Sequence, residues 1–309
     1  METVVIGAVF LDIKGFPFAG YDRVGTNLGS IMLTHGGVAR NVAEDMANLG
    51  QDVSFISMID QDALGNAARD RLLAAGVSLT NTVFTKEKGM GMWLAVFDDK
   101  GDLAGSISHM PAPAPAEALF EEKGEEIIKN AKNVVLEIDL SEPLTERVLT
   151  LSEKYKKDVY VIVANMSVIL KRPDFLSRTK CIILNEIEAG RLFKMPLRGL
   201  APEALLKKVT PKAKEMKLKQ LIVTMGENGA AYIDLEEGIS GLCPAVECIV
   251  VDTTGAGDAF FSACVTALSK GMPLDKAVKC GAKLASLTLS TAESVCPHTE
   301  NDFFRVSEE

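Results

Sequence analysis

The stretch DTTGAGD, residues 252–258, decides the fold class of this chain. It follows the apolar, β-branched run CIVV (248–251), which is typical of a buried strand. It precedes AFFSACVTAL (259–268), where apolar residues recur at helical spacing. The sequence therefore predicts a strand, a glycine turn and the start of a helix.

The predicted glycine turn suits an anion. Gly255 and Gly257 let a ligand approach the backbone closely, and Ala256 adds little bulk. The first amides of a helix have no partner within it and carry the positive end of its dipole, which favours a phosphate. Asp258 then places a carboxylate beside an anion site, where it could accept the proton of a hydroxyl attacking phosphorus. The alternative is an Asp that merely caps the helix.

Composition limits the classes of function. The chain has 309 residues, a formal net charge of −9 and a pI near 5.1, which argues against nucleic acid or an anionic membrane as the main partner. No apolar run approaches the roughly 20 residues that cross a bilayer. The N-terminus lacks a basic leader and a cleavage site, so we expect a cytoplasmic protein.

The cysteines are expected to be reduced core thiols rather than parts of disulfides or a zinc site. They show no CxxC spacing and no pairing with the three histidines at metal-ligand spacing. The six are Cys181, Cys243, Cys248, Cys264, Cys280 and Cys296.

Strand and helix patterns alternate along most of the chain, which predicts an α/β fold with a doubly wound, mainly parallel sheet covered by helices on both faces. Helical patterns occupy residues 38–49 and about 62–75. Apolar runs typical of strands occupy residues 3–11, 53–59, 133–138, 159–163, 181–184 and 221–224. The proline-rich stretch 111–116 is predicted to be a stiff spacer.

Two regions interrupt this alternation. Residues 13–35 are rich in glycine and aromatic residues, and residues 89–110 predict a hairpin around 98–101. Met90, Met92, Trp93 and Phe97 would give that hairpin an apolar face. Both regions could also be surface excursions packed on the core.

Two separate segments resemble the signatures of the ribokinase-like (PfkB) carbohydrate and nucleoside kinases. The stretch 252–258 resembles the C-terminal signature, and GGVARNVA (36–43), running on to Leu49-Gly50, resembles the N-terminal one. They lie more than two hundred positions apart in the family's order, and the resemblance covers essentially the whole chain. It implies a single ribokinase-like domain over 1–309, with a small β lid from about 13–35 and 89–110 that closes over the sugar. The implied reaction is transfer of the γ-phosphoryl group of ATP to a hydroxymethyl group of a sugar or nucleoside.

The acceptor is expected at the carboxyl end of the first strand, because doubly wound sheets bind ligands at that edge. Asp12 ends the predicted strand and matches the family's N-terminal Asp, whose carboxylate accepts from vicinal hydroxyls. Gly36 and Gly37 would bring backbone against the sugar, and Asn41, one turn into the helix, can donate and accept. Taken singly, Asp12 could cap a turn and Asn41 could face solvent.

Two further elements resemble the family's nucleotide site. Asn185 and Glu188 fit an Asn-x-x-Glu element, in which Asn185 approaches the phosphates and Glu188 holds Mg²⁺ through water. Thr224, Gly226 and Gly229 fit a Thr-x-Gly-x-x-Gly nucleotide loop. Alone, the first could be an ordinary acidic first turn of a helix and the second a hairpin turn.

The resemblance also assigns the reacting centre. Asp258 would take the proton, and the backbone amides of Gly255, Ala256 and Gly257 would form the anion hole. Asp252 and Thr254 belong to a loop whose carbonyls often bind potassium in the family, which stays an open question here.

One departure concerns the magnesium shell. Many members carry an Asp-containing segment after the strand 159–163, where this chain has Ala164 and Asn165. Either Asn165 supplies the polar group or the shell differs in detail.

The segment from Thr26-Asn27 through the double glycine to Asn41 looks most like the pseudouridine kinases of the family. The acceptor would then be the 5′ hydroxyl of pseudouridine, with Asn27 near its ribose or base. Ribokinase- or fructokinase-type enzymes and other nucleoside kinases share the core motifs and remain alternatives.

Functions outside this group are disfavoured. A catalytically silent sugar-binding sensor should lack the base, yet Asp258 is present. An oxidoreductase would need a Gly-x-Gly-x-x-Gly that residues 7–12 do not supply. The expected partner is a small molecule, with neither nucleic acid nor membrane, and a homodimer through the lid stays open.

Overall fold

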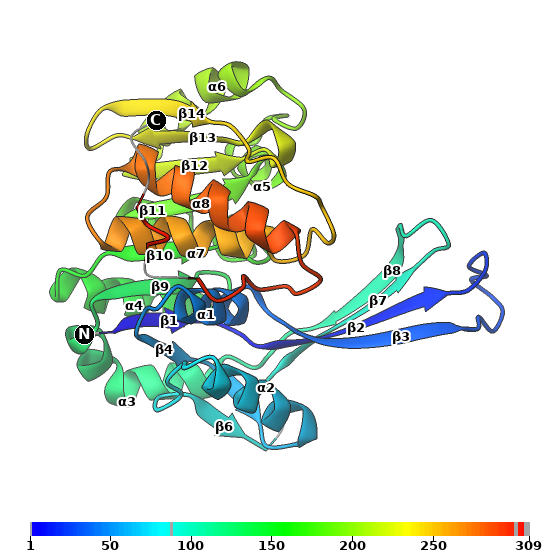
Figure 1. Ribbon diagram of the computed structural model, residues 1–309. Helices are drawn as coiled ribbons and strands as arrows, with labels where there is room; N and C mark the ends of the chain where they lie inside the picture. The colour runs from blue at the N-terminus through cyan, green and yellow to red at the C-terminus, as the bar shows by residue number, and fades with distance from the viewer. Residues whose placement is uncertain (1, 87–88, 300–301, 306–309) are drawn as a thin grey trace.

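An eight-stranded sheet runs through the centre of the computed structural model, which describes residues 2–86, 89–299 and 302–305 (Figure 1). The neighbouring strands β4, β1, β9, β10, β11 and β12 of this sheet are parallel to one another, and β13 and β14 add an antiparallel edge. In spatial order the strands are β14 (Ile239–Cys243), β13 (Ala230–Asp234), β12 (Gln220–Thr224), β11 (Cys181–Asn185), β10 (Val159–Ile162), β9 (Asn133–Glu137), β1 (Thr3–Ile6) and β4 (Val53–Ile56).

Helices cover both faces of this sheet, because alternate side chains of the buried strands point to opposite sides and each side needs an apolar cover. On β9, for example, Val134 and Leu136 belong to one core and Val135 to the other. One face is covered by α1 (Val38–Asn48), α2 (Ala63–Ala74), α7 (Ala256–Ser269) and α8 (Leu274–Leu289). The other is covered by α3 (Ala114–Asn130), α4 (Glu142–Lys154), α5 (Glu186–Phe193) and α6 (Pro202–Glu215).

These two cores confirm the predicted α/β fold class. Short 3₁₀ turns occupy Pro173–Arg178 and Gly226–Asn228. The predicted spacer over 111–116 is shorter than expected, because α3 already begins at Ala114, with Pro113 at its cap position and Pro115 in its first turn, where a missing N–H costs nothing.

The two interrupting regions pair with each other into a second, four-stranded sheet that extends away from the main body (Figure 1). We call it the small sheet, and its order is β3 (Gly29–Gly36), β2 (Phe10–Pro17), β7 (Gly91–Phe97) and β8 (Leu103–His109). The predicted hairpin is confirmed as β7 and β8. Asp98 holds its turn by accepting from the amides of Lys100 and Asp102 at 2.9 and 2.8 Å. A two-stranded sheet pairs β5 (Met58–Asp60) with β6 (Val83–Thr85).

The predicted first strand, 3–11, is wrong in its length. β1 ends at Ile6, and the chain joins the small sheet at Phe10. The break lies at Gly7, which packs so tightly that a Cβ there would meet Ala39 Cβ at 2.3 Å. Asp12 therefore does not end the first strand but lies within β2. Residues 53–59 likewise form two strands, β4 and β5.

The predicted strand 248–251 is also wrong. Ile249, Val250 and Val251 are 84%, 57% and 59% exposed, and no described strand pairs with them. The Val251 amide donates instead to the Leu289 carbonyl at 2.8 Å, at the end of α8. β-Branched residues favour extended backbone, which explains the strand-like pattern. Burial of these side chains would require pairing with a neighbouring strand, and the edge strand β14 does not pair with them.

The cysteines lie within the described residues; five of them are buried and Cys248 is half-buried. Among the described helices, none combines the length and apolar character that a bilayer span would require.

Candidate active site

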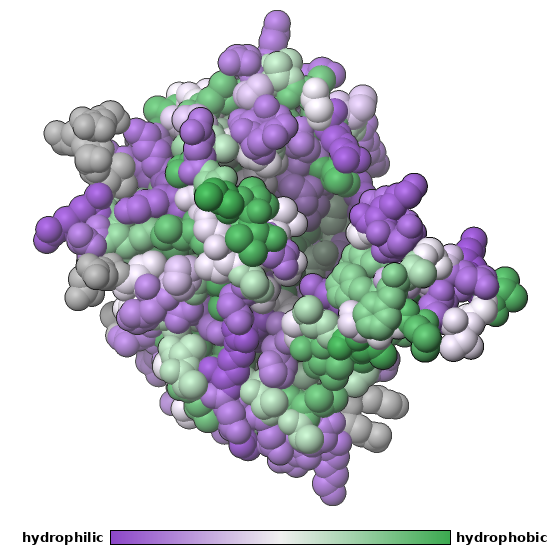
Figure 2. All heavy atoms as spheres, turned by 45° about the vertical axis from the view of Figure 1, so that its right-hand side comes forward, coloured by the Kyte–Doolittle hydropathy of each residue, from purple (hydrophilic) through white to green (hydrophobic). Residues whose placement is uncertain are grey.

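Three cavities lie around the first turn of α7, and of these three only the large one is also lined by residues of the small sheet. The large cavity, of about 780 Å³, opens in the hollow visible in Figure 2, and the middle cavity measures about 230 Å³. A third, of about 290 Å³, is lined by Ala245, Val246, Phe260 and Leu289 among others, and we call it the apolar cavity. Asp258 lines both the large and the middle cavity, and Gly257 lines both the middle and the apolar one. The first turn of α7 is thus the point where all three meet.

The glycine turn before α7 is built around Gly255. Its φ of 80° is left-handed, and a Cβ there would meet the Ser294 carbonyl oxygen at 1.9 Å. No acceptor is found among the described residues for the backbone amides of Gly257 and Asp258. These two amides at the positive end of α7 are therefore available to an anion. Of the three amides predicted to form the anion hole, that of Ala256 donates to the Thr253 carbonyl at 3.5 Å.

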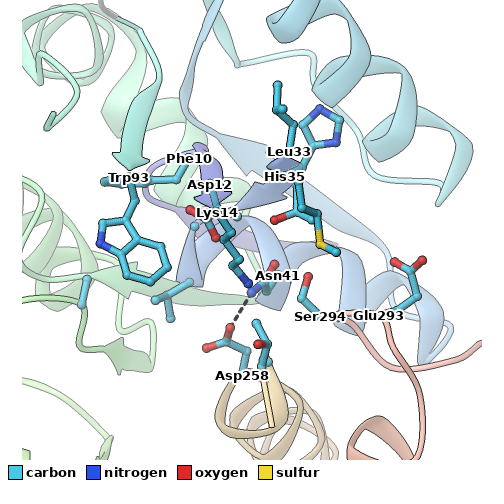
Figure 3. Close-up of a pocket in the computed structure, with 18 of the residues that line it drawn as sticks. Phe10, Asp12, Lys14, Leu33, His35, Asn41, Trp93, Asp258, Glu293 and Ser294 are labelled. Atoms are coloured by element: carbon cyan, nitrogen blue, oxygen red, sulfur yellow. Dashed lines mark hydrogen bonds between the residues drawn. The ribbon is translucent and has the colours of Figure 1, made fainter. Parts of the chain in front are cut away.

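Asp258 does not cap the helix. The cap position is Gly255, without a side-chain bond, and the Asp258 carboxylate instead accepts from Asn41 Nδ2 at 2.6 Å (Figure 3). Burial of that carboxylate raises the pKa of Asp258 to about 7, and the nearby charge of Glu188 adds to the rise. The Asn41 hydrogen bond and the Arg40 charge oppose it. Near neutral pH the group can therefore both accept and return a proton.

The predicted acceptor residues lie together at the large cavity. Asp12, Gly36, Gly37 and Asn41 all line it, although Asp12 reaches it from β2 instead of from the end of β1. Gly36 leaves room for the carboxylate, since a Cβ there would meet Asp12 Oδ2 at 2.4 Å. Burial raises the pKa of Asp12, while the charges of Lys14 and Arg40 oppose the rise.

Asn41 holds an unused acceptor at this cavity. The residue is 6% exposed, and its Oδ1 has no hydrogen-bond partner among the described residues. A buried polar atom without a partner is costly, so a ligand donor is expected to complete it.

Asn27 is the predicted site residue that the structure places elsewhere. It lies in the β2–β3 turn, where its side chain accepts from the Asp22 amide and donates to the Asp22 carbonyl, both at 2.8 Å. It lines none of the three cavities. Thr26-Asn27-x-Gly29 is better explained as a turn that closes itself, so this position gives no support to a substrate contact.

Glu137 is a site residue that sequence reasoning missed. It ends β9, lines the large cavity, and accepts from the Ala8 amide at 2.8 Å. Burial raises the pKa of Glu137 to about 7, and the charges of Asp139 and Asp258 add to the rise. The signal was present, because this is a charged residue at the end of an otherwise apolar strand run.

Aromatic and basic groups also line the large cavity without having been predicted there. Phe10, Lys14 and Trp93 come from the small sheet, and Figure 3 shows them on its side of the cavity. Trp93 had been assigned only to the apolar face of a hairpin. Its cavity-facing role depends on pairing between β2 and β7, which are about eighty residues apart in sequence.

Arg40 fixes the backbone beneath the acceptor residues. It is fully buried, donates to the carbonyls of His35 and Gly36, and pairs with Glu44 at 2.5 Å. Glu44 also pairs with Arg71 at 2.9 Å. A buried, fully partnered arginine holds its neighbours in one geometry.

Asn185 and Glu188 line the middle cavity but also cap α5. Asn185 Oδ1 accepts from the amides of Ile187 and Glu188 at 2.9 Å, and Glu188 Oε2 accepts from the Asn185 amide at 2.9 Å. Thus the ordinary helix-cap role is real, and it leaves the Asn185 Nδ2 and the second Glu188 oxygen for a ligand. Burial raises the pKa of Glu188.

Thr224 connects the middle and apolar cavities, and Gly226 and Gly229 line the apolar one. Gly229 has a φ of 81°, and a Cβ there would meet the Cys243 carbonyl oxygen at 2.0 Å. Ala256, in the first turn of α7, lines the apolar cavity as well.

Asp252 and Thr254 line the large cavity beside Gly255. Asp252 Oδ1 accepts from the Thr254 amide at 2.8 Å, and this bond is the main cause that lowers the pKa of Asp252. Over the described residues, no group of three His, Cys, Asp or Glu side chains forms a ready metal cage.

Asn165 lines the large cavity, and its Oδ1 accepts from the Ser167 amide at 2.9 Å. Asp139 holds the same loop by accepting from the amides of Ala164, Met166 and Val168.

The chain is similar in sequence and in fold to known proteins. Residues 2–299 match the family described as pfkB family carbohydrate kinase. A guanosine-inosine kinase of Exiguobacterium acetylicum is 33% identical over 95% of this chain and 96% of its own length. A pseudouridine kinase of Escherichia coli (strain K12) is 26% identical over 97% and 92%. The structure of Arabidopsis thaliana ribokinase complexed with ribose and ATP superposes with a TM-score of 0.84 at 21% identity, covering 99% of each chain, which shows the shared fold.

Proposed function

Because the chain belongs to the pfkB family of carbohydrate kinases and is an ATP-dependent sugar or nucleoside kinase, we propose that its acceptor is the 5′ hydroxyl of a nucleoside. The observation that carries this proposal is the composition of the large cavity. Asp12 offers a carboxylate for ribose hydroxyls, Asp258 lies on the opposite wall, and Phe10 and Trp93 add aromatic surface.

In this proposal Asp258 accepts the proton of the 5′ hydroxyl as its oxygen attacks the γ-phosphorus. The free amides of Gly257 and Asp258, at the start of α7, face the charge that develops on the transferring group. Gly255 and Ala256 shape the turn that presents these amides. Asp12, the double glycine and Asn41 hold the ribose, which supplies the orientation that phosphoryl transfer depends on.

The donor nucleotide is assigned to the other two cavities. Its base fits the apolar cavity at Gly226 and Gly229, and its phosphates run past Thr224 and Asn185 through the middle cavity toward α7. The remaining oxygen of Glu188 suits Mg²⁺, an ion that keeps much of its water shell and neutralises phosphate charge. Asp252 and Thr254 stay the candidates for a potassium-binding loop.

A nucleoside suits the cavity better than a free sugar. A pentose needs only the polar end formed by Asp12 and Asn41, and would leave Phe10 and Trp93 without a partner. A nucleobase stacked on such side chains buries both aromatic faces. Relatives with 33% and 26% identity act, by their names, on nucleosides.

Two nucleoside types are candidates within this class. Pseudouridine is the acceptor predicted from residues 26–41, although the placement of Asn27 removes one contact on which that prediction depended. Guanosine and inosine are favoured by the 33% identical relative. The larger purine base would also fill more of a cavity of about 780 Å³.

We also propose that the small sheet acts as the lid and joins two copies of the chain. Its strands alternate, so that Asp12 and Trp93 face the cavity while their neighbours face outward. On the outward side Ile31 and Ile107 are 73% and 70% exposed, and Figure 2 shows the apolar surface that the sheet carries. An apolar face of this kind is typical of a protein–protein contact.

The test is a comparison of kcat/KM at saturating ATP for guanosine, inosine, pseudouridine, uridine, ribose and fructose, with Asp258→Asn as the background control. We expect at least one nucleoside to exceed ribose and fructose by tenfold or more. Trp93→Ala should then reduce that nucleoside preference and leave ribose turnover within about threefold. A preference for ribose or fructose in the parent protein would contradict the nucleoside proposal and leave the kinase assignment intact.

A further inference from the structure

The small sheet brings a positive charge into the large cavity. Side chains two residues apart on a strand share a face, so Asp12 and Lys14 of β2 point to the same side. That side is the cavity side, because Asp12 pairs across the sheet with Thr34 and Trp93, and all of them line the cavity. Lys14 lines it as well.

The Lys14 ammonium group acts electrostatically on two carboxylates that line the cavity. The Lys14 charge acts to lower the pKa of Asp12 on the small sheet and also that of Asp252 beside the glycine turn. Lys14 also lines the same cavity as Asp12 of the proposed ribose site and Gly255 of the turn that begins α7. Figure 3 shows its side chain in the cavity next to Asp12.

Lys14 differs from the other cations at this cavity in having no fixed partner. Arg40 is paired with Glu44, and Arg71 with Glu44 and Glu293. Within the described part of the chain, Lys14 makes neither an ion pair nor a side-chain hydrogen bond. Its three N–H donors are thus available to a ligand.

The carboxylates at the large cavity indicate what the Lys14 ammonium group can do there. The carboxylates of Asp12, Glu137, Asp252 and Asp258 all line the large cavity. A phosphoryl group that passes from the middle cavity to an acceptor enters this acidic environment, where its own negative charge is repelled. The Lys14 ammonium group at this cavity can offset that repulsion, and low local dielectric makes the effect larger than in water.

We propose that Lys14 is a further catalytic residue, which donates from its ammonium group to a non-bridging oxygen of the γ-phosphoryl group during transfer. In that step the acceptor oxygen forms a bond to phosphorus, the bond from phosphorus to the leaving oxygen of ADP breaks, and the hydroxyl proton goes to Asp258. Lys14 stays protonated throughout. The inference rests on the proposed function of this site, and it explains why one strand carries both groups: β2 delivers the ribose carboxylate and the phosphate cation together.

The experiment compares Lys14→Met, which keeps the length of the side chain without its charge, with Lys14→Arg, which keeps a charge. Lys100→Met is the matched control, because Lys100 lies in the exposed turn of the same small sheet. For each protein kcat and the KM of the acceptor are measured. The affinity for ADP with Mg²⁺ is measured with and without aluminium fluoride, which mimics the phosphoryl group in transfer.

We expect Lys14→Met to reduce kcat on the order of a hundredfold, in the range found when one transition-state donor is removed, with acceptor KM within about threefold. The gain in affinity that aluminium fluoride gives to ADP should shrink by a similar factor, while the affinity for ADP alone stays the same. Lys14→Arg should restore most of both quantities, and Lys100→Met should match the parent.

Two results would overturn the inference. A raised acceptor KM with unchanged kcat would make Lys14 an acceptor contact, and unchanged values of every quantity would make it a surface lysine. Failure of the nucleoside proposal can be told apart from failure of the Lys14 inference. The nucleoside proposal fails if the parent protein prefers ribose or fructose, whatever the Lys14 variants do. Lys14 can then be tested with whichever acceptor the parent phosphorylates, and the ADP measurements need no acceptor turnover.

Discussion

Replacing Asn41 by alanine should shift the pH dependence of the reaction, and the structure gives the size of the shift. Asn41 Nδ2 donates to the Asp258 carboxylate at 2.6 Å from a side chain that is 6% exposed. This bond favours the charged form and so lowers the pKa of Asp258, which burial raises to about 7. A hydrogen bond to a charged group contributes about 1.5–3 kcal/mol. Since one pKa unit corresponds to about 1.4 kcal/mol, its loss should raise the pKa of Asp258 by about one to two units.

The base works only in its ionised form, so kcat/KM should rise with pH through the pKa of Asp258. In the parent protein this acidic limb is expected near pH 7, and in Asn41→Ala near pH 8 to 9. The parent is half ionised at pH 7, so the variant should lose about fivefold to fiftyfold there, and it should recover most of that loss by pH 9.5.

The assay is kcat/KM for the preferred acceptor from pH 5.5 to 10 at saturating ATP. Asn48→Ala is the control, because Asn48 lies on the same helix but donates to the Cys296 carbonyl at 2.8 Å. Asn48→Ala should leave the acidic limb of the kcat/KM profile at the same pH as in the parent protein. An acidic limb of Asn41→Ala within about 0.3 units of the parent, with an equal loss at every pH, would refute the coupling to Asp258 and leave Asn41 as an acceptor contact only.

Three further perturbations test other parts of the site. Asp12→Ala should raise the acceptor KM and leave ATP affinity within about threefold, and an equal loss of both would contradict the division into two binding regions. Gly255→Ala should cost about 1–3 kcal/mol in chemical denaturation, because its φ is 80° and the new Cβ would meet Ser294 at 1.9 Å, whereas Gly257→Ala, with open space around it, should not. Asp45→Asn should gain stability relative to the parent as pH rises from 5 to 7, by up to about 2.7 kcal/mol, because burial raises the pKa of Asp45 to about 8 and folding then favours the protonated acid. A difference that does not change with pH would show that Asp45 stays charged when folded.

Much of the fold and of the turn before α7 could be predicted from the sequence, because these features depend on residues that are close together along the chain. The glycine turn at Gly255 and the helix after it follow from residue types that tolerate few other conformations. The alternating apolar runs fix the sheet and its two cores.

The remaining features depend on partners that are distant in sequence. Residues 249–251 resemble a strand but pair with none of the strands in the described part of the chain. Lys14 and Trp93 come to the same cavity only because β2 pairs with β7. Glu137 could have been found from its charge alone. The turn around Asn27 is local but could not be predicted, since Asp22, the partner in both of its 2.8 Å hydrogen bonds, is an ordinary surface residue.

The most direct test of the central claim is the turnover of Asp258→Asn. The substitution keeps the shape of the side chain and its place beside Asn41, but removes the group that accepts the proton. We expect single-turnover phosphorylation of the preferred acceptor to fall by several orders of magnitude, while the affinities for ATP and for the acceptor, measured by calorimetry, stay within about threefold of the parent. A phosphorylation rate within about threefold of the parent would contradict the claim that Asp258 is the base of this kinase.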